Sequence, residues 1–181
     1  MFGKAGSSDE EMSEMFKKRR GNTRYLEANM IDQYSFGVLK LEQLNEALAL
    51  IRDVFNEYEA PDYSDEGIQE FMRFIEPVAI SEKLTGNELQ MWKCEDNGRI
   101  IGVLAARPGH VCLLFVHGQY HRRGIARCLL DKMIEHYDPS EITVNSSPYA
   151  VEAYRRLGFV DTDIEKTVNG MRFTAMKRII P

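Results

Sequence analysis

The chain has 181 residues, 28% of them charged, and a formal net charge of -5, as expected for one soluble globular domain with a substantial core. The acidic balance argues against a general nucleic-acid binder, whose phosphate contacts require a basic face. No apolar run is long enough to span a membrane, and the first residues lack the apolar centre of a signal peptide.

The cysteines also point to an intracellular protein. Cys94, Cys112 and Cys128 lie among apolar residues and lack the spacing of metal ligands. We interpret them as reduced core thiols, which predicts a cytoplasmic protein with no metal site.

Residues 1–30 differ from the rest of the chain. They contain an acidic run followed by a basic run, with almost no apolar periodicity. We interpret them as a flexible, charged N-terminal extension that precedes a folded domain over residues 31–181. A basic segment that docks a partner is the less favoured alternative, because charge runs are usually just solvated.

The folded part begins with a strand and two helices. Residues 35–40 suit a first strand, and residues 41–56 have the apolar spacing of an amphipathic helix. A second helix is expected to start at Ser64, which is a good N-cap, and to stop at Pro77.

Three strands then form an antiparallel meander. Residues 88–95, 99–107 and 110–116 are joined by tight turns at Asn97-Gly98 and Pro108-Gly109. Val111 to Val116 are all apolar, which is typical of a strand buried on both faces.

A polar turn and a helix follow this buried strand. From Gly124 onward apolar residues recur at helical spacing as far as Tyr137. The start of a helix exposes unpaired N–H groups and the positive end of its dipole. With Arg122 and Arg123 beside it, and a glycine that allows close approach, this turn is predicted to bind an anion, most plausibly phosphate.

The last third of the chain completes the sheet. Residues 141–147 are expected to form a strand parallel to residues 110–116, because a helix connects the two. A helix over residues 148–157 has Ser147 as its N-cap and ends at Gly158. Residues 159–164 and 171–177 then pair as a hairpin around Asn169-Gly170.

This element order and two motifs resemble the GNAT superfamily of acetyl-CoA-dependent N-acetyltransferases. The first motif is His121-Arg122-Arg123-Gly124-Ile125-Ala126, which has histidine where the family has glutamine or arginine. The second is Tyr154-Arg155-Arg156-Leu157-Gly158-Phe159, and the resemblance extends over residues 35–177. It implies an α/β fold with a mixed, mostly antiparallel sheet of about six to seven strands and helices on both faces. The sheet is splayed between its fourth and fifth strands.

The resemblance implies a site for acetyl-CoA, the expected cosubstrate. The resemblance also implies a bulge in the strand before the turn, where backbone groups of Leu114, Phe115 and Val116 hold the pantetheine arm and polarise the thioester carbonyl. This would stabilise the oxyanion of the tetrahedral intermediate. In a second family pattern, Asn-x-x-Ala-x-x-x-Tyr, Ser147 replaces the asparagine, and Asn145 could share its role. The remaining candidate contacts are the pyrophosphate-binding turn, Arg122, Arg123, Gly124, Ile125, Ala126 and Arg127, together with Ala150.

The resemblance assigns the acid of the reaction more firmly than the base. Tyr154 matches the tyrosine that protonates the departing coenzyme A thiolate. The buried strand contains no carboxylate, and His110 lines up with a histidine used by some amine acetyltransferases. A water relay, or an acceptor that arrives already neutral, is equally admissible. The acidic residues near the first helix could attract a cationic amine, or could simply be solvated: Glu57, Glu59, Asp62, Asp65 and Glu66.

The leading hypothesis is therefore an N-acetyltransferase. An acetyl group passes from acetyl-CoA to a primary amine of a small molecule or peptide by direct attack in a ternary complex. The alternative is a non-catalytic acyl-CoA-binding regulatory module, which the missing base and Ser147 favour and Tyr154 disfavours. If the strand after Gly170 lies at a sheet edge, it could pair with a second subunit in a homodimer.

Overall fold

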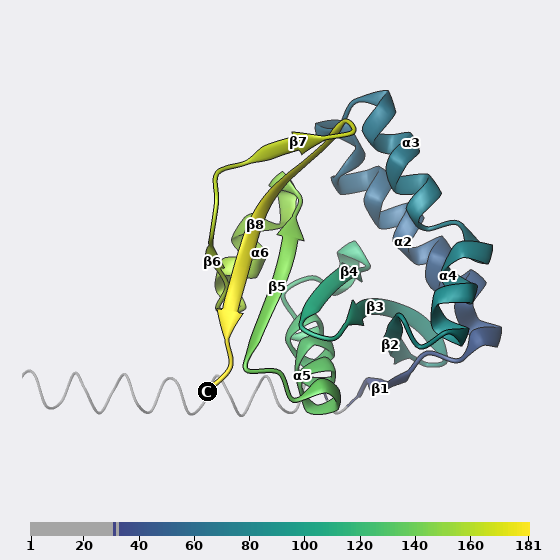
Figure 1. Ribbon diagram of the computed structural model, residues 1–181. Coiled ribbons are helices and arrows are strands. Elements are labelled where there is room, and N and C mark those ends of the chain that lie inside the picture. The colour runs from purple at the N-terminus through teal and green to yellow at the C-terminus, as the bar shows by residue number, and fades with distance from the viewer. Residues whose placement is uncertain (1–30, 32) are drawn as a thin grey trace, which may run out of the picture. The chain divides into compact units, whose positions relative to one another are not determined.

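One mixed β-sheet organises the folded part of the chain (Figure 1). A computed structural model describes residue 31 and residues 33–181, so the extension proposed for residues 1–30 lies outside the described residues. The strands within them are β1 (Ser35–Val38), β2 (Gln90–Asp96), β3 (Arg99–Arg107), β4 (His110–Val116), β5 (Glu141–Ser146), β6 (Val160–Asp161), β7 (Lys166–Val168) and β8 (Met171–Ile179).

The strand order is β1-β2-β3-β4-β5-β8-β6, with β7 paired to a different part of β8. Every pair in the sheet is antiparallel except β4 and β5, which are parallel as predicted. The helices are α2 (Leu44–Tyr58), α3 (Asp65–Phe74), α4 (Pro77–Thr85), α5 (Ile125–Tyr137) and α6 (Val151–Arg156), with short 3-10 turns η1 (Leu41–Gln43), η2 (Ala60–Asp62), η3 (Gly118–Tyr120) and η4 (Pro148–Ala150). None of the helices in the described residues is both long and apolar enough to cross a bilayer.

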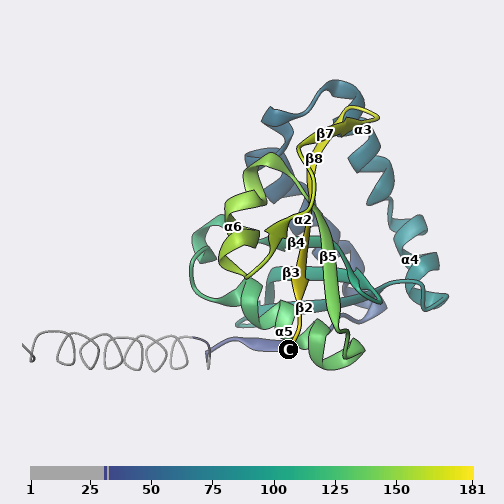
Figure 2. The same cartoon turned by 60° about the vertical axis from the view of Figure 1, so that its left-hand side comes forward.

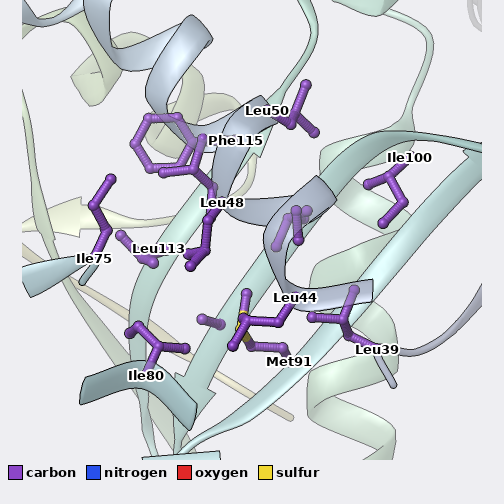
Figure 3. Packing of buried hydrophobic residues seen from close by; sticks show 14 of the residues in the cluster. Leu39, Leu44, Leu48, Leu50, Ile75, Ile80, Met91, Ile100, Leu113 and Phe115 are labelled. Carbon is purple, nitrogen blue, oxygen red and sulfur yellow. The ribbon is translucent and has the colours of Figure 1, made fainter. Parts of the chain in front are cut away.

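Helices cover both faces of the sheet, and the central strand β3 is therefore buried on both sides. Ile100 and Val103 belong to a core shared with α2, α3 and α4, while Ile101 and Leu104 belong to a core shared with α5. In Figure 3 leucines of α2 lie close to Met91 of β2, with Ile80 of α4 beside them. This confirms the predicted arrangement of helices on both faces.

The sheet opens between β4 and β5, as the resemblance implied. The two strands pair only at His110 with Thr143 and at Val111 with Val144. Beyond these pairs β5 continues along β8 and leaves the β1–β4 half of the sheet (Figure 1). The β5-facing edge of β4 therefore has no strand partner from residue 112 onward among the described residues. We call the space between the diverging strands the β4–β5 gap.

A bulge lies in β4, but not at the expected residues. Ala105 of β3 pairs with Leu113, while the next residue, Ala106, pairs with Val111. Cys112 is therefore the extra residue of the bulge, because two steps along β4 match one step along β3. Leu114, Phe115 and Val116, which were expected to form the bulge, pair regularly with β3.

The second helix was predicted to stop at Pro77, and α3 ends just before it, at Phe74. Pro77 also begins α4, a helix that was not predicted. Proline is well tolerated in the first turn of a helix, because the N–H that it lacks would have no partner there. The prediction of Ser64 as N-cap of α3 is confirmed, since its hydroxyl accepts a hydrogen bond from Gly67 N at 3.3 Å.

The C-terminal hairpin also differs from its prediction. The segment before β8 is split into β6 and β7, which raises the strand count in the described residues to eight instead of six or seven. Along Thr174–Ile179 β8 pairs with β5, and at Met176 and Lys177 also with β6, so this part is not the edge strand expected after Gly170. Met171, Arg172 and Phe173 pair only with β7, and a homodimer through these residues stays a prediction.

The turn between β7 and β8 is locked against the start of α3. In Figure 2, as in Figure 1, this turn lies beside α3. A Cβ added at Gly67 would overlap the carbonyl group of Gly170, lying 2.6 Å from its carbon atom. A Cβ added at Gly170 would lie 2.5 Å from the Gly67 nitrogen. The two backbones touch because neither residue has a side chain.

We expect Gly67→Ala to lower stability by about 1–3 kcal/mol, because the backbones must separate to admit a methyl group. The melting temperature should fall by several degrees. Gly37→Ala is the matched control, since an added Cβ there has no atom within 4 Å and should leave the melting temperature nearly unchanged. Equal melting temperatures for the two variants would contradict the proposed lock.

Candidate active site

The turn after β4 forms the predicted helix start. Gly124 is the N-cap of α5 with φ 82°, and Arg122 has φ 61°, so two residues of the turn are left-handed. The first hydrogen bond of the helix runs from Cys128 N to Gly124 O, at 3.1 Å. The N–H groups before Cys128 therefore have no acceptor within the helix and point toward the turn, as an anion site requires.

The three arginine side chains in and just after this turn differ in their contacts. Arg123 donates a hydrogen bond to the Tyr34 hydroxyl at 3.1 Å, and its guanidinium lies 5.0 Å from the centre of the Tyr120 ring. Arg127 donates to the carbonyl of Arg156 at 3.2 Å. Arg122 is exposed, and it makes no ion pair with any described residue.

Arg122 lies on the side of the β4–β5 gap. Burial, Glu57 and Glu59 raise the pKa of Tyr149, and the charge of Arg122 opposes this rise. Because Tyr149 follows β5 and Arg122 follows β4, the arginine charge reaches across the open end of the gap. Of the three arginine side chains, that of Arg122 is best placed for an anion in the gap.

Tyr154 is buried beside the gap. It lies in α6 with 7% of its surface exposed, and its ring meets Phe159 edge to face at a centroid distance of 5.2 Å. Burial is the main cause that raises its pKa, followed by the charges of Glu59 and Cys112. Its phenol therefore stays protonated at neutral pH, and the core around Tyr154 also includes Val144 of β5 and Leu114 of β4.

Glu59 is a residue that the sequence analysis placed only in an acidic cluster. It is the C-cap of α2, where the negative end of the helix dipole disfavours a carboxylate. Burial raises its pKa to about 7, and Asp62 adds to the rise, while the Ser147 hydroxyl opposes it. Its charge also raises the pKa of Tyr154, and the ring of Tyr58, the residue before it, lies 5.1 Å from that of Tyr149, which precedes α6.

Ser147 connects Glu59 to the β5 side of the gap. It follows β5, with only 8% of its surface exposed, and its hydroxyl has no hydrogen-bond partner in the described residues. It is near enough to Glu59 to lower the pKa of that carboxyl, although no hydrogen bond of ordinary geometry joins them. A buried, unpartnered hydroxyl is costly, which suggests that a ligand satisfies it.

The structure separates Asn145 from this group. Its side chain is exposed, and in the sheet it pairs with Ala175 of β8. Ala150 lies in η4, half-buried, and packs against the core that contains Tyr154. We therefore place Ser147 and Ala150 beside the gap and find no geometry that gives Asn145 the same role.

His110 lies at the closed end of the gap. Its Nδ1 lies 2.8 Å from the Thr143 hydroxyl oxygen, and Thr143 donates a hydrogen bond to the carbonyl of Gly109 at 3.0 Å. Nδ1 is then the protonated nitrogen, and Nε2 has the free lone pair. Burial and the nearby charge of Arg107 lower the pKa of His110, so the ring is neutral at physiological pH.

Tyr58, the last residue of α2, spans the open end of the gap. Its ring centre is 5.3 Å from that of His121, after β4, and 5.1 Å from that of Tyr149, after β5. A Cβ at Gly118 would overlap the Tyr58 hydroxyl, so this glycine gives the ring its space. Glu59 follows Tyr58 directly and is therefore carried to the gap by the same helix end.

The other acidic residues of the predicted cluster stay in solvent. Glu57, Asp62, Asp65 and Glu66 are exposed, which agrees with a solvated helix start for the last two. Within residues 31 and 33–181, no three His, Cys, Asp or Glu side chains gather in a way that could hold a metal ion.

Comparisons with known proteins identify the family. A family model described as an acetyltransferase (GNAT) domain matches residues 59–180, which is more than half of the chain. The chain belongs to the GNAT acetyltransferase family. The matched range includes Glu59, the β4–β5 gap, the turn before α5 and Tyr154.

Relatives and solved structures agree with this family. YafP of Escherichia coli (strain K12), an uncharacterized N-acetyltransferase, is 34% identical over 70 residues, which cover 39% of this chain and 45% of YafP. This chain spans less than half the length of the curated relatives that it matches.

Two solved structures show the same fold. A GCN5-related N-acetyltransferase from Rhodopseudomonas palustris has a TM-score of 0.69 and 21% identity, with 81% of this chain and 95% of that chain covered. The PaiA N-acetyltransferase from Thermoplasma acidophilum, solved in complex with coenzyme A, has a TM-score of 0.67 and 15% identity, with 81% and 99% covered.

The pKa of Glu59 has a consequence for stability. The folded-state pKa of about 7 lies above the value of 4.5 for a free glutamate, so the folded chain binds more protons between these pH values. Ionisation of Glu59 therefore lowers stability as the pH rises from about 4.5, and the full cost is present above pH 7.

We expect Glu59→Gln to melt at the same temperature as the wild type near pH 4.5 and several degrees higher at pH 8, a gain on the order of 2 kcal/mol. Thermal melts across this pH range measure the difference. Asp53→Asn, an exposed carboxylate on the same helix, is the control and should show no such pH dependence. A constant offset for Glu59→Gln would contradict a raised pKa.

Proposed function

We propose that this protein transfers an acetyl group from acetyl-CoA to a primary amine, by direct attack within a ternary complex. The observation that supports this best is the placement of Tyr154 beside the β4–β5 gap, whose open end faces an anion-binding helix start. A site for the thioester and a site for the pyrophosphate are then provided by one strand and the turn that follows it.

The donor half of the reaction uses mostly backbone groups. Coenzyme A would place its pyrophosphate on the N–H groups before Cys128 and beside Arg122. Its pantetheine arm would run along Leu114 to Val116, on the edge of β4 that lacks a strand partner. An N–H from this edge that points at the thioester carbonyl would stabilise the oxyanion of the tetrahedral intermediate.

Tyr154 would complete the reaction as the general acid. When the tetrahedral intermediate collapses, the C–S bond breaks and the sulfur of coenzyme A leaves as a thiolate. The Tyr154 hydroxyl would give its proton to that sulfur. The raised pKa keeps the proton on the phenol until the thiolate forms.

A non-catalytic acyl-CoA-binding module is the second candidate. The absence of a carboxylate in β4 favours it, because the strand beside the proposed thioester site then supplies no obvious base. Release of free coenzyme A thiol in the presence of amines separates the two functions, since a binding module would hold the ligand without turnover.

The acceptor has to be found by experiment, because the fold does not select it. Other solved acetyltransferase structures, with TM-scores of 0.54 to 0.59 to this chain, have names that mention spermidine, an aminoglycoside or an alanine of a ribosomal protein. We therefore propose spermidine, an aminoglycoside and a peptide with a free N-terminal alanine as the first amines to test.

We expect Tyr154→Phe to lower kcat by about 10²-fold or more, because the thiolate must leave without a positioned proton donor. The dissociation constant for coenzyme A should change little, since the phenol acts on the sulfur late in the reaction. Thiol release and calorimetric titration measure the two quantities. Tyr137→Phe is the control: it removes a tyrosine hydroxyl that donates to the Ala106 carbonyl at 3.2 Å. Full activity of Tyr154→Phe would refute its assignment as the acid.

We expect Arg122→Gln to weaken coenzyme A binding about tenfold and to reduce the dependence of that binding on salt, because a charge beside the phosphates is lost. Arg99→Gln removes an exposed arginine at the start of β3 and should leave the affinity unchanged. Calorimetric titration at two salt concentrations tests both variants. Identical behaviour of the two would exclude Arg122 from the phosphate site.

A further inference from the structure

The position of Glu59 is fixed by the backbone around it. As the C-cap of α2, its N–H donates to Phe55 O at 2.9 Å, and its carbonyl accepts a hydrogen bond from Asp62 N at 2.9 Å. The next turn is closed by Tyr63 N, which donates to Ala60 O at 3.1 Å, with Pro61 inside the turn. The carboxylate therefore stands on a rigid corner and not on a mobile loop.

The groups that face Glu59 come from three parts of the chain. They are Asp62 and Tyr63 from the corner itself, Ser147 and Tyr149 from the segment after β5, and Tyr154 from α6, and each affects the pKa of Glu59 or has its own pKa raised by the charge of Glu59. The contact that brings the corner to this segment is between Tyr58 and Tyr149, whose ring centres are 5.1 Å apart. Two of these groups have a cation nearby: Arg172 beside Tyr63 and Arg122 beside Tyr149. Glu59 itself forms no ion pair with any described residue.

Arg172 is not available to neutralise Glu59. It forms an ion pair with Glu165 at 2.8 Å and donates to the carbonyl of Asp62 at 3.3 Å. A half-buried carboxylate that lacks a cationic partner is costly, so its place is suited to a cation that arrives with a ligand. The unpartnered hydroxyl of Ser147 is a second polar group in the same place that lacks a partner.

Glu59 meets the requirements of a base better than His110. His110 lies where β4 and β5 are still paired, so its free Nε2 is at the closed end of the gap. Glu59 follows Tyr58, whose ring centre is 5.1 Å from that of Tyr149, so its corner lies against the segment that leads into α6 and Tyr154. Tyr154 is the group that would protonate the departing sulfur. In acetyl transfer the base and the acid must reach the same tetrahedral intermediate, because one takes a proton from its nitrogen and the other gives a proton to its sulfur.

We propose that Glu59 binds the ammonium group of the acceptor and removes its proton for attack on the thioester. The inference rests on the acetyl transfer proposed above and names the acceptor class as an amine that is cationic at neutral pH. The Ser147 hydroxyl, beside the carboxylate, supplies the acceptor with a second hydrogen-bond partner.

The protons and electron pairs of the reaction balance. Glu59 takes a proton from the ammonium nitrogen, and the freed lone pair forms the C–N bond as the carbonyl π pair moves to oxygen. That oxygen then reforms the carbonyl, the C–S bond breaks, and Tyr154 gives its proton to the sulfur. The amide nitrogen releases its remaining extra proton to solvent, and the proton on Glu59 returns to Tyr154 through solvent.

The base step also assists the acid step. The negative charge of Glu59 is one cause of the raised pKa of Tyr154. When Glu59 takes up the proton of the acceptor, that charge disappears, and the Tyr154 phenol becomes easier to deprotonate. The phenol is therefore a better proton donor after the amine has been activated than before.

The test compares kcat/KM of the wild type, Glu59→Gln and Asp53→Asn with acetyl-CoA and spermidine, an aminoglycoside or an alanine-ended peptide, from pH 5.5 to pH 9.5. For the wild type, log(kcat/KM) should rise with unit slope to a plateau that begins near pH 7, where Glu59 ionises. Glu59→Gln should lose about 10²-fold at pH 7.5 and should keep rising toward the pKa of the amine itself, because only neutral amine can then attack.

Controls separate this inference from the proposed function. Asp53→Asn should keep the wild-type rate and profile, and Glu59→Asp should recover part of the activity and the plateau, since it keeps a carboxylate. If Glu59→Gln is as active as Asp53→Asn, Glu59 is not the base, although acetyl transfer stands. If His110→Asn removes the plateau instead, the base is His110. If the wild type acetylates none of the three amines, the proposed function fails together with this inference.

Discussion

The structure depends on the early separation of two parallel strands. β4 and β5 share only two residue pairs, and everything that could handle the thioester lies just beyond them. Where the strands part, backbone groups of β4 lose their partners without being exposed at a conventional sheet edge. An unpaired buried N–H or C=O is costly, so the fold can keep such groups only where a ligand or water replaces the missing strand. The gap is thus a consequence of the topology and also its functional part.

Two kinds of side chain converge on this gap from opposite faces of the sheet. Tyr154 belongs to the core under α5, while Glu59 stands at the end of α2, above the other core. An intact sheet would separate them with a layer of backbone. Because the sheet is open here, the charge of Glu59 affects the pKa of Tyr154, and the proposed acid and base, on different faces, could serve one reacting group.

Secondary structure could be predicted from the sequence where the residues that determine it are close together in the chain. The turn before α5 could be predicted because its glycine, its arginines and the helical spacing after it are close together in the chain, and the Asn-Gly turns are equally local. The helix α4 was missed because a proline that ends one helix and a proline that begins the next look alike in sequence. Glu59 could not be singled out, because its burial depends on Ser147 and Tyr154, which lie almost ninety residues or more along the chain. Its one local signal, a carboxylate at a helix C-terminus just before a proline, is weak.

The contact between Gly67 and Gly170 limits how this chain can be re-engineered. Loop length is usually the freest variable in a protein, since insertions in surface turns cost little. Here one extra residue in the β7–β8 turn would shift Gly170 out of register with α3, and the two backbones would no longer meet. The length of that hairpin is therefore fixed. Changes to this part of the chain would therefore have to exchange side chains along the two strands and keep the turn at its present length.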